Sequence, residues 1–247
     1  MSKTIFVTGG SGGIGSATVR QLADRGNKVI FTYNHSKEAA LNLCQEIALK
    51  TGDPNRVVGI QCDLANGSEV RKMMTQNKNL LSGVDVLVNN AGSISSEPQF
   101  LLMANMDNWW KILYNNIACV VNVVRGIAPY MIRRRKGMII NMSSISGLGG
   151  DPGQSAYAAS KAAIANLTKS LNKELSSFGI IVNSVSPGLI DTRMAQETTN
   201  SYRNHIVDYT MAKRLGKPAE VASLITYLAL DAPSYLVNQN IEIAGGL

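Results

Sequence analysis

Tyr157 and Lys161 are the residues of this chain whose types and spacing point most directly to chemistry. Residues four positions apart lie on the same face of a helix. The sequence around them favours a helix, with Ser155 as a cap and an alanine-rich stretch behind it. A cation so close is expected to lower the pKa of the tyrosine phenol toward the working pH. Such a phenol can exchange a proton with an alcohol or a carbonyl oxygen.

Ser144 adds a third group to this pair. It follows the apolar run Met138–Met142, which predicts a strand that ends in a loop. Its hydroxyl is expected to hold the same oxygen and to stabilise charge there. A Tyr-x-x-x-Lys pair also occurs on ordinary surface helices, so the interpretation depends on the motifs that accompany it.

A glycine-rich turn at the start of the chain is the strongest of these motifs. A predicted strand at 4–8 is followed by Gly9–Gly15, a helical pattern at Ser16–Arg25 and a second strand at Lys28–Tyr33. This order within about 30 residues predicts a dinucleotide-binding unit, in which the glycines let the backbone approach a pyrophosphate at a helix N-terminus. Two registers stay open for the motif. One uses Gly10, Gly12 and Gly15, and the other uses Gly9, Gly13 and Gly15.

The end of the second strand predicts which dinucleotide is bound. An acidic residue there would bind the free 2′-hydroxyl of NAD. The sequence instead runs Tyr33-Asn34-His35-Ser36-Lys37, with no acid before Glu38, and therefore predicts NADP(H). Asp63 follows a third predicted strand, Arg56–Gln61. Its carboxylate would either accept from the adenine amino group or cap a turn, and both readings stay open.

The remaining pattern alternates strands and helices along the whole chain. It predicts an α/β fold, a single-domain Rossmann-type doubly wound parallel sheet with helices on both faces, over residues 1–247. Residues from about 193 to 215 are polar and poorly periodic, which predicts a mobile lid over the substrate. The predicted helices are Ser36–Leu49, Glu69–Leu81, Asp107–Arg125 and Pro218–Leu230, and the further strands are Val84–Val88, Met138–Met142, Ile180–Val185 and Asn240–Ile243.

Composition limits the functional classes. No run approaches 18 uninterrupted apolar residues, and the N-terminus lacks the layout of a secretion signal, so neither a membrane span nor export is expected. Cys44, Cys62 and Cys119 lack metal-type spacing, so we expect no metal and a reducing, cytoplasmic setting. The net charge of +7 includes one dense basic run, Arg133–Lys136, with no interleaved aromatics. An anionic cofactor and an acidic partner explain this charge as well as nucleic acid does, and we expect no nucleic-acid partner. A solvated helix end would explain the basic run itself.

With these residues together, the chain resembles the short-chain dehydrogenase/reductase family over its whole length, and most of all its β-ketoacyl-[acyl-carrier-protein] reductase and acetoacetyl-CoA reductase branch. The resemblance implies that Tyr157 is the general acid, that Lys161 holds the nicotinamide ribose and that Ser144 binds the substrate carbonyl. It also implies that Asn116, through a helix distortion, holds a water that feeds protons to Lys161. The cofactor contacts it implies are Gly9, Ser11, Gly12, Gly13, Ile14, Gly15, Asn34, His35, Ser36, Asp63, Leu64, Asn90, Ala91, Gly92, Tyr157, Lys161, Pro187, Gly188, Ile190 and Thr192.

The activity implied by the resemblance is the NADPH-dependent reduction of a 3-oxoacyl thioester, linked to acyl carrier protein or CoA, in fatty-acid or polyketide-type synthesis. The alternatives are the same chemistry on a sugar, polyol or steroid, or a catalytically silent binding subunit. Two positions depart from the family pattern: Gly12 stands where NADP-binding relatives often carry arginine, and Phe178 stands where carrier-binding relatives place a second basic residue beside the match at Arg135. The family also implies a homotetramer, and the tryptophans at 109 and 110 are expected in the core or at a subunit interface.

Overall fold

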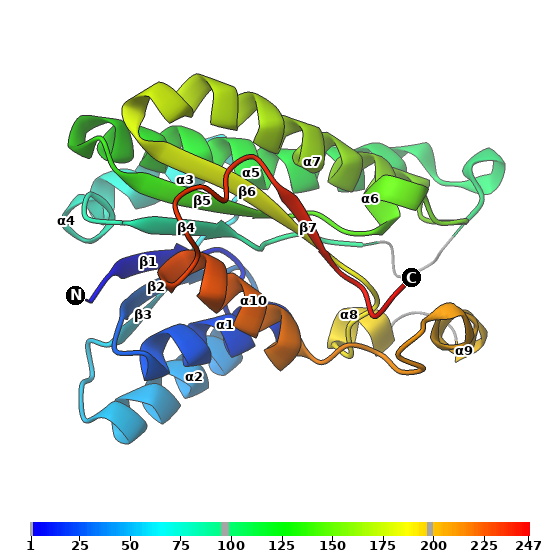
Figure 1. The fold of residues 1–247 in the computed structure, drawn as a ribbon, viewed down its shortest axis with the longest axis horizontal. Helices are drawn as coiled ribbons and strands as arrows, with labels where there is room; N and C mark the ends of the chain where they lie inside the picture. The colour runs from blue at the N-terminus through cyan, green and yellow to red at the C-terminus, as the bar shows by residue number, and fades with distance from the viewer. Residues whose placement is uncertain (1, 95–98, 197–199) are drawn as a thin grey trace.

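The computed structural model describes residues 2–94, 99–196 and 200–247, and in it seven parallel strands form one sheet (Figure 1). Their order across the sheet is β3-β2-β1-β4-β5-β6-β7, which confirms the doubly wound α/β class. The order reverses between β1 and β4, so a crevice opens at the carboxyl ends of the strands at that point. The strands are β1 Thr4–Val7, β2 Lys28–Tyr33, β3 Val57–Gln61, β4 Val86–Asn89, β5 Gly137–Met142, β6 Ile180–Pro187 and β7 Asn240–Ile243.

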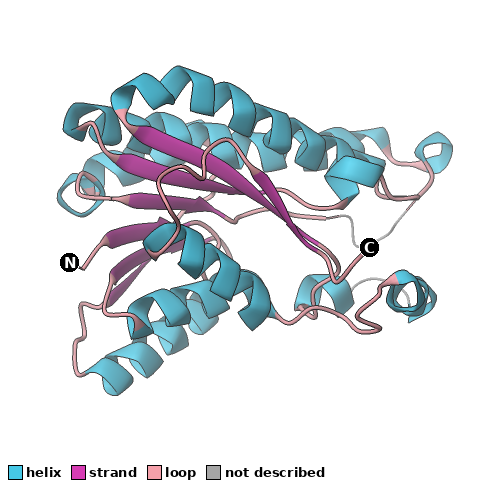
Figure 2. Cartoon of the chain, viewed as in Figure 1, coloured by secondary structure: helices cyan, strands magenta, loops and turns pink. Residues whose placement is uncertain are grey.

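Helices cover both faces of this sheet, as Figures 1 and 2 show. Alternate residues of a strand point to opposite faces, so Ile5 and Val7 of β1 join one core and Phe6 joins the other. The first core is closed by α1 Gly13–Asp24, α2 Lys37–Thr51 and α10 Pro218–Leu230. The second is closed by α3 Gly67–Gln76, α4 Lys78–Leu81, α5 Met106–Arg134 and α7 Ser155–Leu175.

Two helices differ from the sequence-based expectation. The helix expected to end at Arg125 continues through Pro129 to Arg134, because Ile127 and Met131 on the same face are fully buried and outweigh the hydrogen bond that proline removes. The helix expected over 69–81 is divided at Asn77, whose side chain donates to the Met73 carbonyl at 3.0 Å. An amide that competes for the backbone in this way favours a break.

The length and composition of α5 would allow it to cross a membrane. Its most apolar 18-residue window has a mean hydropathy of 1.2, and 44% of that window is buried within the described structure. The helix packs between α3 and α7, and the buried side chain of Asn116 lies at its middle. These contacts are those of a core helix.

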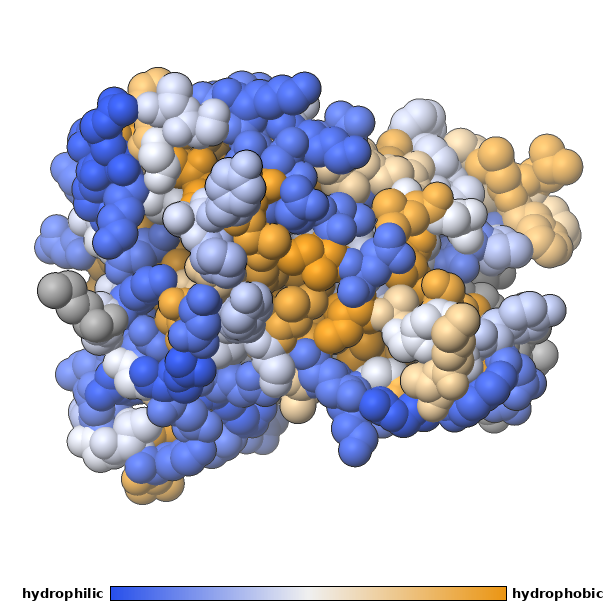
Figure 3. Space-filling view, viewed as in Figure 1, coloured by the Kyte–Doolittle hydropathy of each residue, from blue (hydrophilic) through white to orange (hydrophobic). Residues whose placement is uncertain are grey.

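The region expected to form a mobile lid holds two helices, α8 Arg193–Gln196 and α9 Asn200–Tyr209. Residues 197–199 of the expected lid lie outside the described residues. In Figure 1, α8 and α9 lie near the C-terminus, beyond the carboxyl ends of β6 and β7. Figure 3 shows apolar residues gathered between this region and the rest of the molecule. The sequence missed the helices because the segment lacks a clear apolar stripe.

Candidate active site

The predicted site residues from the first half of the chain meet at the carboxyl ends of β1 and β4. The Thr8 hydroxyl, directly after β1, accepts from the backbone N–H groups of Asn90 and Ala91, at 2.9 Å each. The Asn90 side chain donates to the carbonyls of Thr8 and Gly9, at 3.0 and 3.1 Å. These bonds fix the loop after β4 against the glycine turn. Asn90 was among the expected cofactor contacts, whereas Thr8 belongs to the motif that carries the family resemblance but had no predicted role.

The distance from an added Cβ to the nearest atoms shows which positions of the turn require glycine. Gly9 has φ +65°, and a Cβ there would lie 3.0 Å from the Ala91 Cα. A Cβ at Gly13 would lie 2.6 Å from the Thr192 methyl, and one at Gly15 would lie 2.2 Å from the Gly9 carbonyl oxygen. At Gly12 the nearest such contact is 3.6 Å. A Cβ at Gly10 would also lie 2.5 Å from the Phe31 Cβ, so the spacing Gly10, Gly12, Gly15 fails at Gly12, whereas all three glycines of the spacing Gly9, Gly13, Gly15 are required. The contact at Gly13 also brings Thr192 against the turn.

We expect Gly15→Ala to destabilise the protein by about 2 to 3 kcal/mol, because the added methyl would press on a backbone oxygen. Gly12→Ala is the matched control, since it adds the same methyl to the same turn with only an ordinary contact, 3.6 Å from the Gly9 oxygen, and should leave the unfolding free energy nearly unchanged. Urea unfolding of both variants measures the difference. Equal stability of the two variants would contradict this account of the turn.

The residues around this turn fit a dinucleotide. Gly12 is the N-cap of α1 and has no side chain, and no acidic side chain stands in the described first turn of the helix. The N-terminal amides of α1 are thus placed to hold a pyrophosphate. Asn34, His35 and Ser36 follow β2 and are all exposed, which suits contact with a 2′-phosphate. Leu64 is buried after β3, and its carbonyl accepts from the Asn122 side chain at 2.9 Å.

Asp63 occupies a turn in this structure. Its Oδ1 atom accepts from the Ala65 N–H at 3.0 Å, while its own N–H donates to Glu69 at 3.1 Å. The α3 N-cap is Asn66, whose side chain accepts from two amides of the first turn. The Oδ1 atom of Asp63 therefore stabilises a turn, which was one of the two predicted roles. The other role, a hydrogen bond from the adenine amino group to this carboxylate, remains a proposal.

The second half of the chain brings Ser144, Tyr157 and Lys161 together. The Lys161 Nζ lies 5.6 Å from the centre of the Tyr157 ring and donates to the Met142 carbonyl at 2.8 Å. The Ser143 hydroxyl donates to the Lys161 carbonyl at 2.8 Å, which ties the end of β5 to α7. Ser144 is buried and has a side-chain hydrogen bond with Tyr157. The phenol, the amine and the hydroxyl thus meet at one end of the sheet.

The protonation of this trio differs from the expectation. Burial raises the pKa of the Tyr157 phenol, the hydrogen bond with Ser144 acts in the opposite direction, and the carboxylate of Asp151 raises it further. The expected lowering of the Tyr157 pKa is therefore contradicted by the direction of the shift, because burial of the phenol is the largest contribution to it. Burial also lowers the pKa of Lys161 to about 8.

Asn116 has a different local environment from the one that the resemblance implies. The helix is continuous through it, so the expected distortion is absent from the described residues of α5. Its amide donates to the Ser93 carbonyl and to the Ser160 hydroxyl, both at 2.9 Å, and its oxygen accepts from the Ser93 N–H at 2.8 Å. A Cβ at Gly92 would lie 3.4 Å from both the Asn116 oxygen and the Lys161 Nζ, so this loop runs between them.

One contact near the site was not predicted from the sequence. Ser155 does not cap α7, since Gln154 is the N-cap and the Ser155 hydroxyl instead accepts from the Trp109 indole at 2.9 Å. Trp109 thereby joins the start of α7 to α5, while Trp110 is 58% exposed. No periodicity pairs these side chains, because they belong to different helices.

The residues after β6 form the other wall of the site. The Pro187 carbonyl accepts from the Ile145 N–H at 3.1 Å, and Gly188 donates to the Ile243 carbonyl at 3.0 Å. Ile190 is buried and pairs with Gly216. These bonds hold the segment that carries Thr192 next to the loop that carries Ser144.

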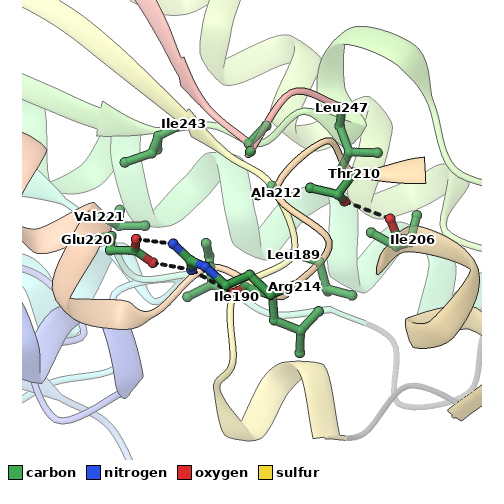
Figure 4. A pocket seen from close by; sticks show the side chains of 15 residues that line it. Leu189, Ile190, Ile206, Thr210, Ala212, Arg214, Glu220, Val221, Ile243 and Leu247 are labelled. Atoms are coloured by element: carbon green, nitrogen blue, oxygen red, sulfur yellow. Dashed lines mark hydrogen bonds and ion pairs between the residues drawn. The ribbon is translucent and has the colours of Figure 1, made fainter. Parts of the chain in front are cut away.

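A pocket of about 170 Å³ is lined in part by residues 206–215 of the segment expected to form a lid (Figure 4). Arg214 and Glu220 face one another at its rim and form two hydrogen bonds, at 2.8 and 2.6 Å. Ser144, Tyr157 and Lys161 do not line this pocket. Gly188 and Ile190, which are expected at the cofactor, do line it.

The basic run closes the C-terminal end of α5. The Arg134 guanidinium donates to the Ser82 and Val84 carbonyls, and Arg135 donates to the Ser177 carbonyl at 2.8 Å. Arg134 and Arg135 thus lie at the C-terminal end of a helix, as the helix-end interpretation of the basic run expected. Arg135 also lies beside the Phe178 segment, since a Cβ at Gly179 would lie 2.5 Å from the Arg135 carbonyl oxygen.

Comparisons with known proteins agree with this geometry. The family model for short chain dehydrogenase matches residues 3–203. The chain is 36% identical over its full length to the 3-oxoacyl-[acyl-carrier-protein] reductase FabG of Staphylococcus epidermidis, covering 99% of that protein. It is also 36% identical to the 3-oxoacyl-[acyl-carrier-protein] reductase of a Synechocystis strain, covering 97% of it. The crystal structure of the 3-oxoacyl-[acyl-carrier protein] reductase from Brucella melitensis superposes with a TM-score of 0.89 at 30% identity, over 99% of this chain and 91% of that one.

Proposed function

The chain belongs to the short-chain dehydrogenase family and is an oxidoreductase, and from this premise we propose that it reduces a 3-oxoacyl thioester to the 3-hydroxyacyl thioester with NADPH. The observation that carries the proposal is the meeting of Ser144, Tyr157 and Lys161 beside a glycine turn built for a dinucleotide. The substrate class rests on relatives that are named 3-oxoacyl-[acyl-carrier-protein] reductases and match the whole chain.

The protein's own part in the reaction is to place the carbonyl and to supply a proton. The reduced nicotinamide, when bound, supplies the hydride that is added to the carbonyl carbon. Ser144 donates a hydrogen bond to the carbonyl oxygen and polarises it. Tyr157 transfers its phenolic proton to that oxygen, and the ammonium of Lys161 near the ring stabilises the phenolate that remains. Solvent then returns a proton to the phenolate, which completes the balance.

The residues that hold the dinucleotide in this proposal follow the strand ends. The glycine turn and the α1 N-terminus hold the pyrophosphate, Lys161 holds the ribose, and Asp63 with Leu64 borders the adenine. Asn116 acts as a positioning residue, because it fixes Ser93 beside the loop that reaches Lys161. The other contacts proposed are Ser11, Ile14, Asn34, His35, Ser36, Asn90, Ala91, Gly92, Pro187, Gly188, Ile190 and Thr192.

We expect Asn34→Asp to reverse the cofactor preference. The wild type should use NADPH more efficiently than NADH, because the exposed residues after β2 accept a phosphate. The introduced carboxylate would repel the 2′-phosphate and bind the free hydroxyl of NADH, so the ratio of kcat/KM values should move by roughly 100-fold toward NADH. Glu38→Gln, further from the strand end, is the control. A wild type that already prefers NADH would refute the NADP assignment.

The substrate class is tested by the oxidation of NADPH with a panel of carbonyl compounds. We expect turnover with acetoacetyl-CoA or an acetoacetyl carrier thioester at a kcat/KM well above that for free ketones, sugars and steroids. A higher efficiency with any free ketone would replace the thioester assignment with another short-chain reductase activity. Absence of turnover throughout the panel would favour a silent binding subunit.

We further propose that residues 1–247 form one catalytic domain of a cytoplasmic homotetramer, with Arg135 as a contact for an acidic carrier protein. Trp110 and Tyr114, 58% and 65% exposed on α5, support a subunit contact on that helix. The three cysteines are free, which agrees with a reducing compartment.

Sedimentation of the purified chain tests the tetramer. The carrier contact is tested by Arg135→Glu, which should raise KM for the carrier thioester but not for the CoA thioester.

A further inference from the structure

A chain of side-chain hydrogen bonds runs from the catalytic serine to the edge of the molecule. The Ser144 hydroxyl contacts the Ser146 hydroxyl at 3.2 Å, and the Ser146 N–H donates to the Ser144 Oγ, also at 3.2 Å. The Ser146 hydroxyl donates to the Asp151 carboxylate. Ser144 and Ser146 are buried and Asp151 is half-buried, so the chain leads from the reacting groups toward solvent.

The carboxylate fixes the direction of this chain. An ionised carboxylate only accepts, so the proton of the Ser146 hydroxyl is committed to Asp151. The Ser146 oxygen is then left to accept, and it accepts from the Ser144 hydroxyl. Ser144 is thus held by two bonds to one residue, and that residue is held by a third bond to Asp151.

Ser144 needs such support because of where it stands. It follows the end of β5 in a loop, and its hydroxyl must meet both a carbonyl oxygen and Tyr157. A hydroxyl rotates freely unless its neighbours fix it, and a small misplacement of a catalytic group lowers the rate steeply. The carboxylate is also close enough to influence Tyr157, whose pKa it raises.

We infer that Ser146 and Asp151 are positioning residues for the reduction. The bond from the Ser146 hydroxyl to Asp151 anchors Ser146, and the Ser146 N–H then fixes the Ser144 oxygen. The single Ser144 proton, directed to Ser146 in this structure, turns to the carbonyl oxygen when substrate binds. The inference rests on the proposed function only in requiring that Ser144 contacts the substrate carbonyl. Neither residue stood among the site residues expected from the sequence. Ser146 is the first residue of the short glycine-containing helix α6, Ser146–Gly149, and Asp151 follows that helix.

The test is a set of mutant cycles on kcat. With NADPH and acetoacetyl-CoA, Ser146→Ala should lower kcat about 10-fold with little change in KM for NADPH, and Ser146→Thr should restore most of the loss. In a Ser144→Ala background the same Ser146→Ala change should lower kcat by less than about 2-fold, because the residue it acts through is gone. Ser223→Ala, which removes a serine hydroxyl on α10, should leave kcat at the wild-type value.

Two results would overturn the inference. One is a wild-type kcat in Ser146→Ala, and the other is the same fold-loss in the Ser144→Ala background as in the wild type. Should Ser146→Ala fail to fold, Asp151→Ala, at the half-buried end of the hydrogen-bonded chain, replaces it. This variant should also lower kcat in the wild type and have little effect in the Ser144→Ala background. The proposed function is tested separately by wild-type turnover. If the wild type reduces only another carbonyl compound, the cycles are measured with that compound.

Discussion

Replacement of Tyr157 by phenylalanine is expected to lower kcat for the reduction of a 3-oxoacyl thioester by about 1000-fold. The change removes one oxygen and leaves the ring that packs near Lys161. The carbonyl would then lose its proton donor while the dinucleotide keeps its binding surface. Binding of NADPH, followed by its fluorescence, should therefore stay within about 2-fold of the wild type.

The control for this variant is Tyr227→Phe, which makes the same chemical change at a half-exposed position on α10. It should keep the wild-type kcat. If Tyr157→Phe retained a tenth or more of the wild-type kcat, another group would have to supply the proton, and the assignment of the general acid would be withdrawn.

Lys161→Met is expected to abolish most activity and at the same time to stabilise the dinucleotide-free protein. The buried amine has a pKa of about 8 against 10.5 for an ordinary lysine, so burial of its charge costs on the order of 3 kcal/mol at neutral pH. Methionine has no charge to bury, but it leaves the Met142 carbonyl without its donor. The net gain expected in the free energy of unfolding at pH 7 is about 2 kcal/mol. The loss in kcat should be about 100-fold or more, since nothing then stabilises the phenolate.

The pH dependence gives this prediction a definite sign. Because the pKa of Lys161 is lowered on folding, the unfolded chain binds more protons between about pH 8 and 10.5. The wild-type free energy of unfolding should therefore rise across that window relative to Lys161→Met, and the advantage of the variant should disappear near pH 10.5. Urea unfolding at both ends of the window measures it. A variant that is less stable than the wild type at pH 7 would show that the buried charge is not costly.

The sequence predicted the parts of the fold that local patterns encode. Lys28–Tyr33, Pro218–Leu230 and Asn240–Ile243 have the bounds that apolar runs and a first-turn proline indicated. The extent of α5 beyond Arg125 was not predictable in this way, because burial of Ile127 and Met131 against the sheet decides whether Pro129 is tolerated.

In the candidate site, too, local spacing predicted some features, while burial and contacts between loops decided others. Spacing along the chain was enough to place Tyr157 near Lys161, and strand ends were enough to bring Asn90 to the glycine turn. Spacing did not reveal burial, and burial decides the direction in which the pKa of Tyr157 moves. The roles of Thr8, Ser146 and Asp151 depend on contacts between loops, which leave no period in the sequence.

We propose that this site adds a hydride and a proton to a 3-oxo carbonyl group. The direct measurement uses NADPH labelled with deuterium at the transferred position and acetoacetyl-CoA, with the product analysed by mass spectrometry. We expect deuterium on the third carbon of the 3-hydroxyacyl product with the wild type, and almost no product with Tyr157→Phe. Oxidation of NADPH without label in that product, or equal labelling by both proteins, would contradict it.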